Sequence, residues 1–76
     1  MIKIQVLTKN RNFMDVLNFI KDFINNSAGD ELLYDTKEVI FYGDTLTIDL
    51  LWLDSNNEWH QQNLADVDQN GNILPN

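Results

Sequence analysis

The sequence contains no cysteine, a single histidine, one proline and only three glycines in 76 residues. Without cysteine the chain can form neither a disulfide nor a thiolate metal site. The lone histidine, His60, cannot take part in a site built from paired histidines and is expected to face solvent. The three glycines are isolated from one another, so the chain lacks a glycine-rich phosphate loop.

Basic residues are scarce as well: five stand against twelve acids, for a formal net charge of −7. The imbalance is uneven, because residues 1–29 hold four basic side chains and two acids, whereas residues 30–76 hold one lysine and ten acids. Such a field repels nucleic acid and attracts a protein with a basic surface, although acidic side chains also serve plain solubility. We therefore expect no direct nucleic-acid binding.

No stretch approaches the roughly 20 apolar residues that a membrane span needs. The opening residues, MIKIQVLTKN, carry a lysine inside a short strand-like run and lack the apolar core of a signal peptide. We expect a protein without membrane contact, located in the cytoplasm. Its length corresponds to one small domain, residues 1–76, with a thin hydrophobic core.

The stretch from Thr45 to Leu53 is the longest apolar run with β character, and the rest of the chain is organised around it. One face of this predicted strand carries Leu46, Ile48, Leu50 and Trp52. The other face begins with polar side chains and then becomes apolar at Leu51 and Leu53. A strand that is apolar on both faces is either covered twice or pairs with something outside the chain.

The remaining patterns predict one helix and further strands. Residues 1–8 alternate as a half-buried strand. An apolar stripe of 3.6-residue period predicts a helix that begins at Asn12 and ends at Gly29. Asn12 is its predicted N-cap, whose side chain accepts from the backbone N–H of Met14 or Asp15. Strands are predicted at 37–42, 45–53 and 58–67, with a brief last one at 73–74, and Gly43-Asp44 is the predicted hairpin turn. Residues 30–35 have no clear assignment. The fold class is α+β, in the order β-α-β-β-β: one amphipathic helix on a mainly antiparallel sheet.

The segment from Asp66 to Ile73 resembles the opening of a calcium loop, with oxygen ligands at Asp66, Asp68, Asn70 and Asn72 around Gly71. The glutamate of position 12 is missing, and so is a helical stripe before the loop. The same residues can form an Asn-Gly hairpin without any ion, and this hairpin is the structure that we expect. No cofactor is expected.

The apolar second face suggests an oligomer interface, formed by Leu51, Leu53 and Tyr42 of the preceding strand. A homodimer is the simplest partner for such a face. A catalytic pair of carboxylates is possible on number alone, but a small sheet with one helix does not imply the concave cleft that an enzyme needs. We expect a protein that is not an enzyme.

Three functions remain open. The first is a small acidic protein that binds and inhibits another protein, in which Asp44, Asp49, Asp54 and Glu58 imitate nucleic-acid phosphates, as small phage-type or mobile-element inhibitors do. The second is a structural or assembly subunit that uses the apolar face to form a homo-oligomer. The third is a weak calcium-binding module. A phosphate mimic needs its carboxylates clustered on one face, whereas an assembly subunit needs only a scatter.

Overall fold

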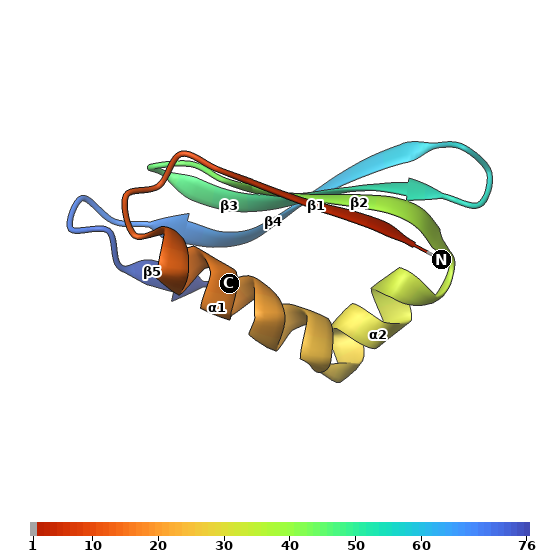
Figure 1. The fold of residues 1–76 in the computed structure, drawn as a ribbon, viewed down its shortest axis with the longest axis horizontal. Helices are drawn as coiled ribbons and strands as arrows, with labels where there is room; N and C mark the ends of the chain where they lie inside the picture. Colours follow the sequence, from red (N-terminus) through yellow and green to blue (C-terminus); the bar gives the residue numbers. More distant parts are fainter. Residues whose placement is uncertain (1) are drawn as a thin grey trace.

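The computed structural model describes residues 2–76, with the backbone but not the side chains of Ser27 and Ala28. Five strands form one sheet, and two helices lie on one side of it (Figure 1). The elements in chain order are β1 (Lys3–Thr8), α1 (Phe13–Asn25), α2 (Ser27–Tyr34), β2 (Thr36–Gly43), β3 (Thr47–Asp54), β4 (Trp59–Val67) and β5 (Ile73–Pro75). The predicted α+β class and element order are confirmed. No helix within residues 2–76 is long and apolar enough to cross a membrane.

The strands lie side by side in the order of the sequence, β1-β2-β3-β4-β5. β1 runs parallel to β2, because the two helices carry the chain back before β2 begins. The other three pairs are antiparallel and follow one another directly through loops. β3, which contains most of the predicted central strand, is the middle strand of the sheet.

The core lies between α1 and the sheet. Val16 and Ile20 of α1 are buried together with alternate residues of the two central strands: Val39, Phe41, Ile48 and Leu50. The ring of Phe23 meets that of Phe41 edge-on, at a centroid distance of 6.0 Å. The apolar stripe of α1 therefore covers one face of the sheet, as its 3.6-residue period predicts.

The N-terminus of α1 lies where predicted, but its capping contacts differ. Asn12 occupies the N-cap position without a side-chain cap hydrogen bond; its amide instead donates to the carbonyl of Gly71, at 3.2 Å. Asn10, which is buried, accepts from the backbone N–H of Asn12 and donates to the carbonyl of Asp44. These amides join the start of the helix to two loops that are distant in the sequence.

The predicted end of the helix at Gly29 is wrong. α1 stops at Asn25, and a second helix, α2, begins at once and includes the segment that had no assignment. Asn26 separates the two helices, because its extended backbone ends α1 while its side chain accepts from the N–H of Gly29 at 2.9 Å. A side-chain cap thus starts a new helix where glycine was expected to end the old one.

The predicted two-residue turn at Gly43-Asp44 is also wrong. Gly43 is the last residue of β2, and residues 44–46 form the loop, so Leu46 leaves the strand and is 72% exposed. A Cβ at Gly43 would approach Val16 of α1 and Thr8 of β1 too closely. This glycine therefore permits close packing of helix and sheet, and its backbone does not have the positive φ of a hairpin glycine.

We expect Gly71→Ala to destabilise the fold by about 1–3 kcal/mol. Gly71 has a φ of 85°, which L side chains rarely adopt, and an added Cβ would collide with the Asn12 amide. Urea unfolding of the two proteins measures the change. The matched control is Asn57→Gly, at the one described non-glycine residue of positive φ, 65°, where stability is expected to stay the same or rise. Equal stability of Gly71→Ala and the parent protein would contradict this account.

Candidate functional site

The face of the sheet that points away from α1 and α2 is the main candidate site, and we call it the open face. Val39, Phe41, Ile48 and Leu50 point into the core, so their neighbours along β2 and β3 point the other way. Neither described helix lies on this side (Figure 1). We define the open face by twelve of these outward residues, three from each of four strands: Lys3, Gln5 and Leu7; Glu38, Ile40 and Tyr42; Asp49, Leu51 and Leu53; Trp59, Gln61 and Asn63.

Strand register arranges these twelve residues in three rows across the sheet. The first row is Lys3, Glu38, Leu53 and Trp59; the second is Gln5, Ile40, Leu51 and Gln61; the third is Leu7, Tyr42, Asp49 and Asn63. Side chains in a row are direct cross-strand neighbours, close enough to contact one another. Each row therefore crosses from the β1 edge of the sheet to β4.

The apolar members of the rows form one diagonal band. It starts at Trp59, passes through the centre of the face and ends at Leu7: Trp59, Leu53, Leu51, Ile40, Tyr42 and Leu7. The two ends are the most exposed of the band, Trp59 at 52% and Leu7 at 50%. A continuous apolar band of this kind on a small domain is typical of a surface that binds protein.

The two corners beside the band are polar, and their charges have partners within the chain. In one corner the Lys3 ammonium lies 3.7 Å from Glu38 Oε1, an exposed pair of little energetic weight. In the other, the Asn63 amide donates to Asp49 Oδ1 at 3.0 Å. Three of the twelve residues are charged, one lysine and two carboxylates, a share close to the 22% of the whole chain, and Asp66 lies beyond the third row on the same side of the sheet. The charges of the three rows lie at the two corners and outside the apolar band, as charges usually lie outside the centre of a protein interface.

All three residues predicted as an oligomer interface, Tyr42, Leu51 and Leu53, lie on the open face. Three further members of the apolar band were missed in the sequence: Leu7, Ile40 and Trp59. The alternation of β1 and β2 could have indicated Leu7 and Ile40, since the side chain of each points to the side of the sheet away from the core residues of its own strand. Their alignment with Leu51 and Trp59 depends on strand register, which short patterns do not specify.

The four carboxylates predicted to contact a partner are dispersed. Asp44 lies in the β2–β3 loop, where it accepts from the backbone N–H of Thr45. Asp49 is on the open face, whereas Asp54 and Glu58 lie at the opposite end of β3, around the β3–β4 loop. The structure brings together only the last two. A row of carboxylates on one face, which a phosphate mimic requires, is not formed by these four residues.

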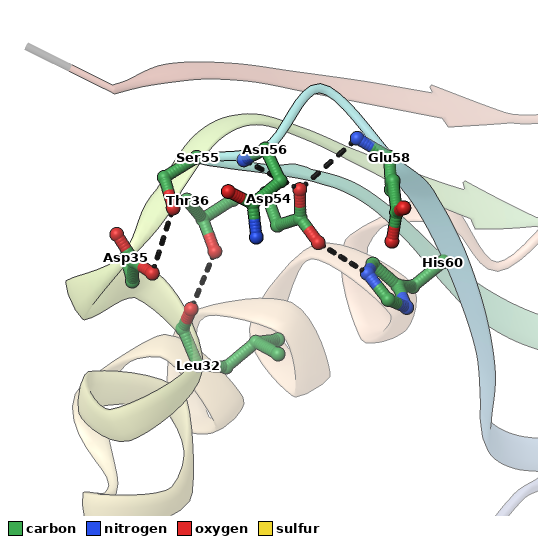
Figure 2. Close-up of polar contacts among 8 residues, drawn as sticks. All are labelled: Leu32, Asp35, Thr36, Asp54, Ser55, Asn56, Glu58 and His60. Carbon is green, nitrogen blue, oxygen red and sulfur yellow. Dashed lines mark hydrogen bonds and ion pairs between the residues drawn. The ribbon is translucent and has the colours of Figure 1, made fainter.

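Asp54 instead organises the β3–β4 loop (Figure 2). Its Oδ1 accepts from the backbone N–H groups of Asn56 and Glu58, at 2.8 and 3.0 Å, and its Oδ2 lies 2.7 Å from His60 Nε2. The imidazole is stacked on the Trp52 indole, with ring centroids 4.9 Å apart. These contacts lower the pKa of Asp54, chiefly through the hydrogen bond to His60 and next through that from Glu58.

The same loop is tied to α2. Ser55 donates to Asp35 Oδ2 at 3.0 Å, and the hydroxyl of Thr36 donates to the carbonyl of Leu32 (Figure 2). Asp54, Glu58 and His60 each offer one metal-ligand atom within 4.8 Å of the others. The hydrogen bonds already given account for the position of Asp54 without an ion. We therefore assign this cluster a structural role, in closing the hairpin against the end of α2.

The calcium-like segment forms the β4–β5 hairpin that the Asn-Gly turn predicts. Asp68 lies at its start, and its carboxylate accepts from the backbone N–H groups of Asn70 and Asn72 and from the Asn72 amide, at 2.9 to 3.2 Å. These donors, the backbone N–H of Asn72 first, lower the pKa of Asp68. Asp66 stands in β4, opposite Leu74 of β5, and Asp68 already has backbone partners that hold its turn.

A hollow with a volume of about 450 Å³ lies between α1, β4 and the C-terminal segment. Apolar side chains, Phe19, Phe23 and Leu64, line much of it, and Asp22 is its one titratable side chain. This hollow offers a place for an apolar group.

No family model matches the chain, and no curated protein or solved structure matches it either. A function for this protein therefore depends on the geometry of its own surfaces. Of those surfaces, the open face is the one that carries a continuous apolar band across four strands.

The Asp54 contacts predict a loss of stability in acid. The pKa of Asp54 in the folded protein is lowered from an ordinary value of 3.8. The ionised carboxylate therefore contributes its full stabilisation above pH 3.8, and this contribution is lost as the pH falls through the lowered pKa of the folded protein. We expect the Tm of the parent protein to fall over this range, and Asp54→Asn to start from a lower Tm and to fall less.

Asp22→Asn, at an exposed position of α1, is the matched control and should follow the parent protein. Part of the acid response should persist in Asp54→Asn, because the lowered pKa of Asp68 acts in the same direction. Thermal unfolding followed by circular dichroism over a series of pH values tests this. Identical pH curves for Asp54→Asn and the parent protein would show that the loop contacts contribute nothing.

Proposed function

We propose that this protein functions by binding another protein chain through the open face of its sheet, and that it is not an enzyme. The observation that carries the proposal is the apolar band, which crosses four strands and has no cover from the helices of residues 2–76. Burial of such a band in a partner supplies affinity through the hydrophobic effect, at about 25 cal/mol per Å² of apolar surface. The cytoplasm is where we expect this binding.

The acidic side chains outside the open face have a different part in this proposal. Ten of the twelve acids lie outside its three rows, and four of these ten are on α1 and α2, on the other side of the sheet. Charges placed in this way steer partners and repel nucleic acid, and they change association rates more than affinity. They favour a partner with a basic surface over nucleic acid, whereas a partner that is itself acidic has to be held by the apolar band.

Inhibition of another protein by phosphate mimicry is the second candidate, and the ten acids of residues 30–76 favour it. The dispersed positions of Asp44, Asp49, Asp54 and Glu58 give it less geometric support than the apolar band gives the first. A combined change of Asp49, Asp54 and Glu58 to their amides separates the two candidates. Mimicry requires that the triple variant lose its partner, whereas binding through the apolar band requires that it keep most of its affinity.

We expect Leu51→Asp to abolish binding through the open face. Leu51 is in the middle row of the band, and a carboxylate buried there without a partner should weaken the affinity by roughly 30-fold or more. Leu46→Asp is the matched control: it makes the same chemical change at a position 72% exposed in the β2–β3 loop, outside the open face. Circular dichroism should show the same fold for all three proteins.

The measurement uses tagged bait versions of the parent protein, Leu46→Asp and Leu51→Asp, with the untagged parent protein included among the candidate partners. Proteins retained by the first two baits and lost from Leu51→Asp support the proposal. Equal retention by Leu51→Asp and Leu46→Asp would show that the open face is not the binding surface.

A further inference from the structure

We propose that the partner of the open face is a second copy of this chain, bound face to face with the two sets of strands crossing at about a right angle. This inference rests on the proposed function and names the partner for it. It follows from the shape of the apolar band and the charges at the two polar corners.

The apolar band fixes how two copies can meet. Strands are about 4.8 Å apart and successive rows about 6.7 Å apart, so the four strands and three rows form a patch of roughly 14 by 13 Å, which is nearly square. The band from Trp59 to Leu7 is a diagonal of this patch. A two-fold axis that lies between the sheets and runs along the diagonal places the band of one copy on the band of the other.

Other two-fold axes in that plane fit the face poorly. An axis parallel to the strands places Glu38 of one copy against Leu53 of the other, and an axis perpendicular to them places Leu53 against Asp49. Both arrangements bury carboxylates against apolar side chains, which costs free energy. The diagonal axis avoids these contacts and turns the strands of the two sheets to about 90°, which is one of the two common geometries of sheet-on-sheet packing.

The same axis makes the polar corners complementary. The corner that holds Lys3 and Glu38 comes to lie over the corner that holds Asp49 and Asn63 in the second copy. Asp49 then lies between Lys3 and Gln5 of the other chain, and Glu38 faces the amides of Gln61 and Asn63. Both carboxylates of the three rows therefore meet a cation or an amide donor, although each chain carries a net charge of −7.

The size of the face limits the strength of the dimer. With half a spacing added at each margin, the patch measures roughly 19 by 20 Å, so two copies crossed at a right angle cover about 380 Å² each, or about 760 Å² together before the added surface of the side chains is counted. This is less than the roughly 1,000 Å² at which specific interfaces begin, so we expect a weak dimer. A domain of this length has a thin core, and a second covered sheet face would add to its stability.

The absence of cysteine allows a test of this geometry by cross-linking. Lys3→Cys and Asn63→Cys are prepared separately, and a short bis-maleimide reagent is added to each alone and to their mixture. The diagonal axis places residue 3 of one copy over residue 63 of the other, whereas the two copies of either residue are about 20 Å apart. We expect covalent dimers in the mixture and none in either protein alone. Gln61→Cys replaces Asn63→Cys should the latter fail to fold.

Sedimentation velocity of the parent protein, over a range of concentrations and at low and high salt, completes the test. We expect a dimer that persists at high salt, because the apolar band holds it and salt screens the repulsion between like-charged copies. Leu51→Asp should sediment as a monomer and Leu46→Asp as a dimer.

Each other result overturns the inference in a recognisable way. A dimer that is cross-linked through Lys3→Cys alone would exclude the diagonal axis. A monomer at all concentrations would exclude the second copy as partner. If that monomer nevertheless retains another protein that Leu51→Asp loses, the proposed function stands and only this inference fails; if it retains none, both fail.

Discussion

The packing of α1 on one face of the sheet is the contact on which the rest of this structure depends. Val16 and Ile20 fill the space over Phe41 and its neighbours, and Gly43 allows helix and strand to approach closely. A chain of this length has no further segment that forms a third layer within residues 2–76. One face of the sheet is therefore buried and the other left without a helix, and the apolar residues of that second face need another explanation.

The amides and carboxylates near the loops serve mainly to hold this two-layer arrangement together. Asn10 and Asn12 join the start of α1 to the β2–β3 and β4–β5 loops, while Asp54 and Asp68 each accept the backbone N–H groups of a turn. Carboxylates used in this way are less available to a partner. Part of the acidic character of residues 30–76 thus has a structural origin, which the net charge alone does not reveal.

The open face combines features that usually distinguish an interface from ordinary surface. Its centre is apolar, aromatic side chains lie along the band, and the charges of its three rows lie at the two corners. An isologous contact suits a surface whose polar corners complement each other across the apolar diagonal.

The sequence by itself determined the α+β class, the element order, the apolar stripe of α1 and the two-sided apolar character of β3, because each follows from a period of 2 or 3.6 along a continuous segment. It also identified Tyr42, Leu51 and Leu53 as one surface. The tertiary structure decided the second helix, the use of Gly43 for packing, the separation of Asp49 from Asp54 and the diagonal band. The physical reason is that these features depend on side-chain capping at Asn26 and on the register of strands far apart in the chain, and local patterns specify neither.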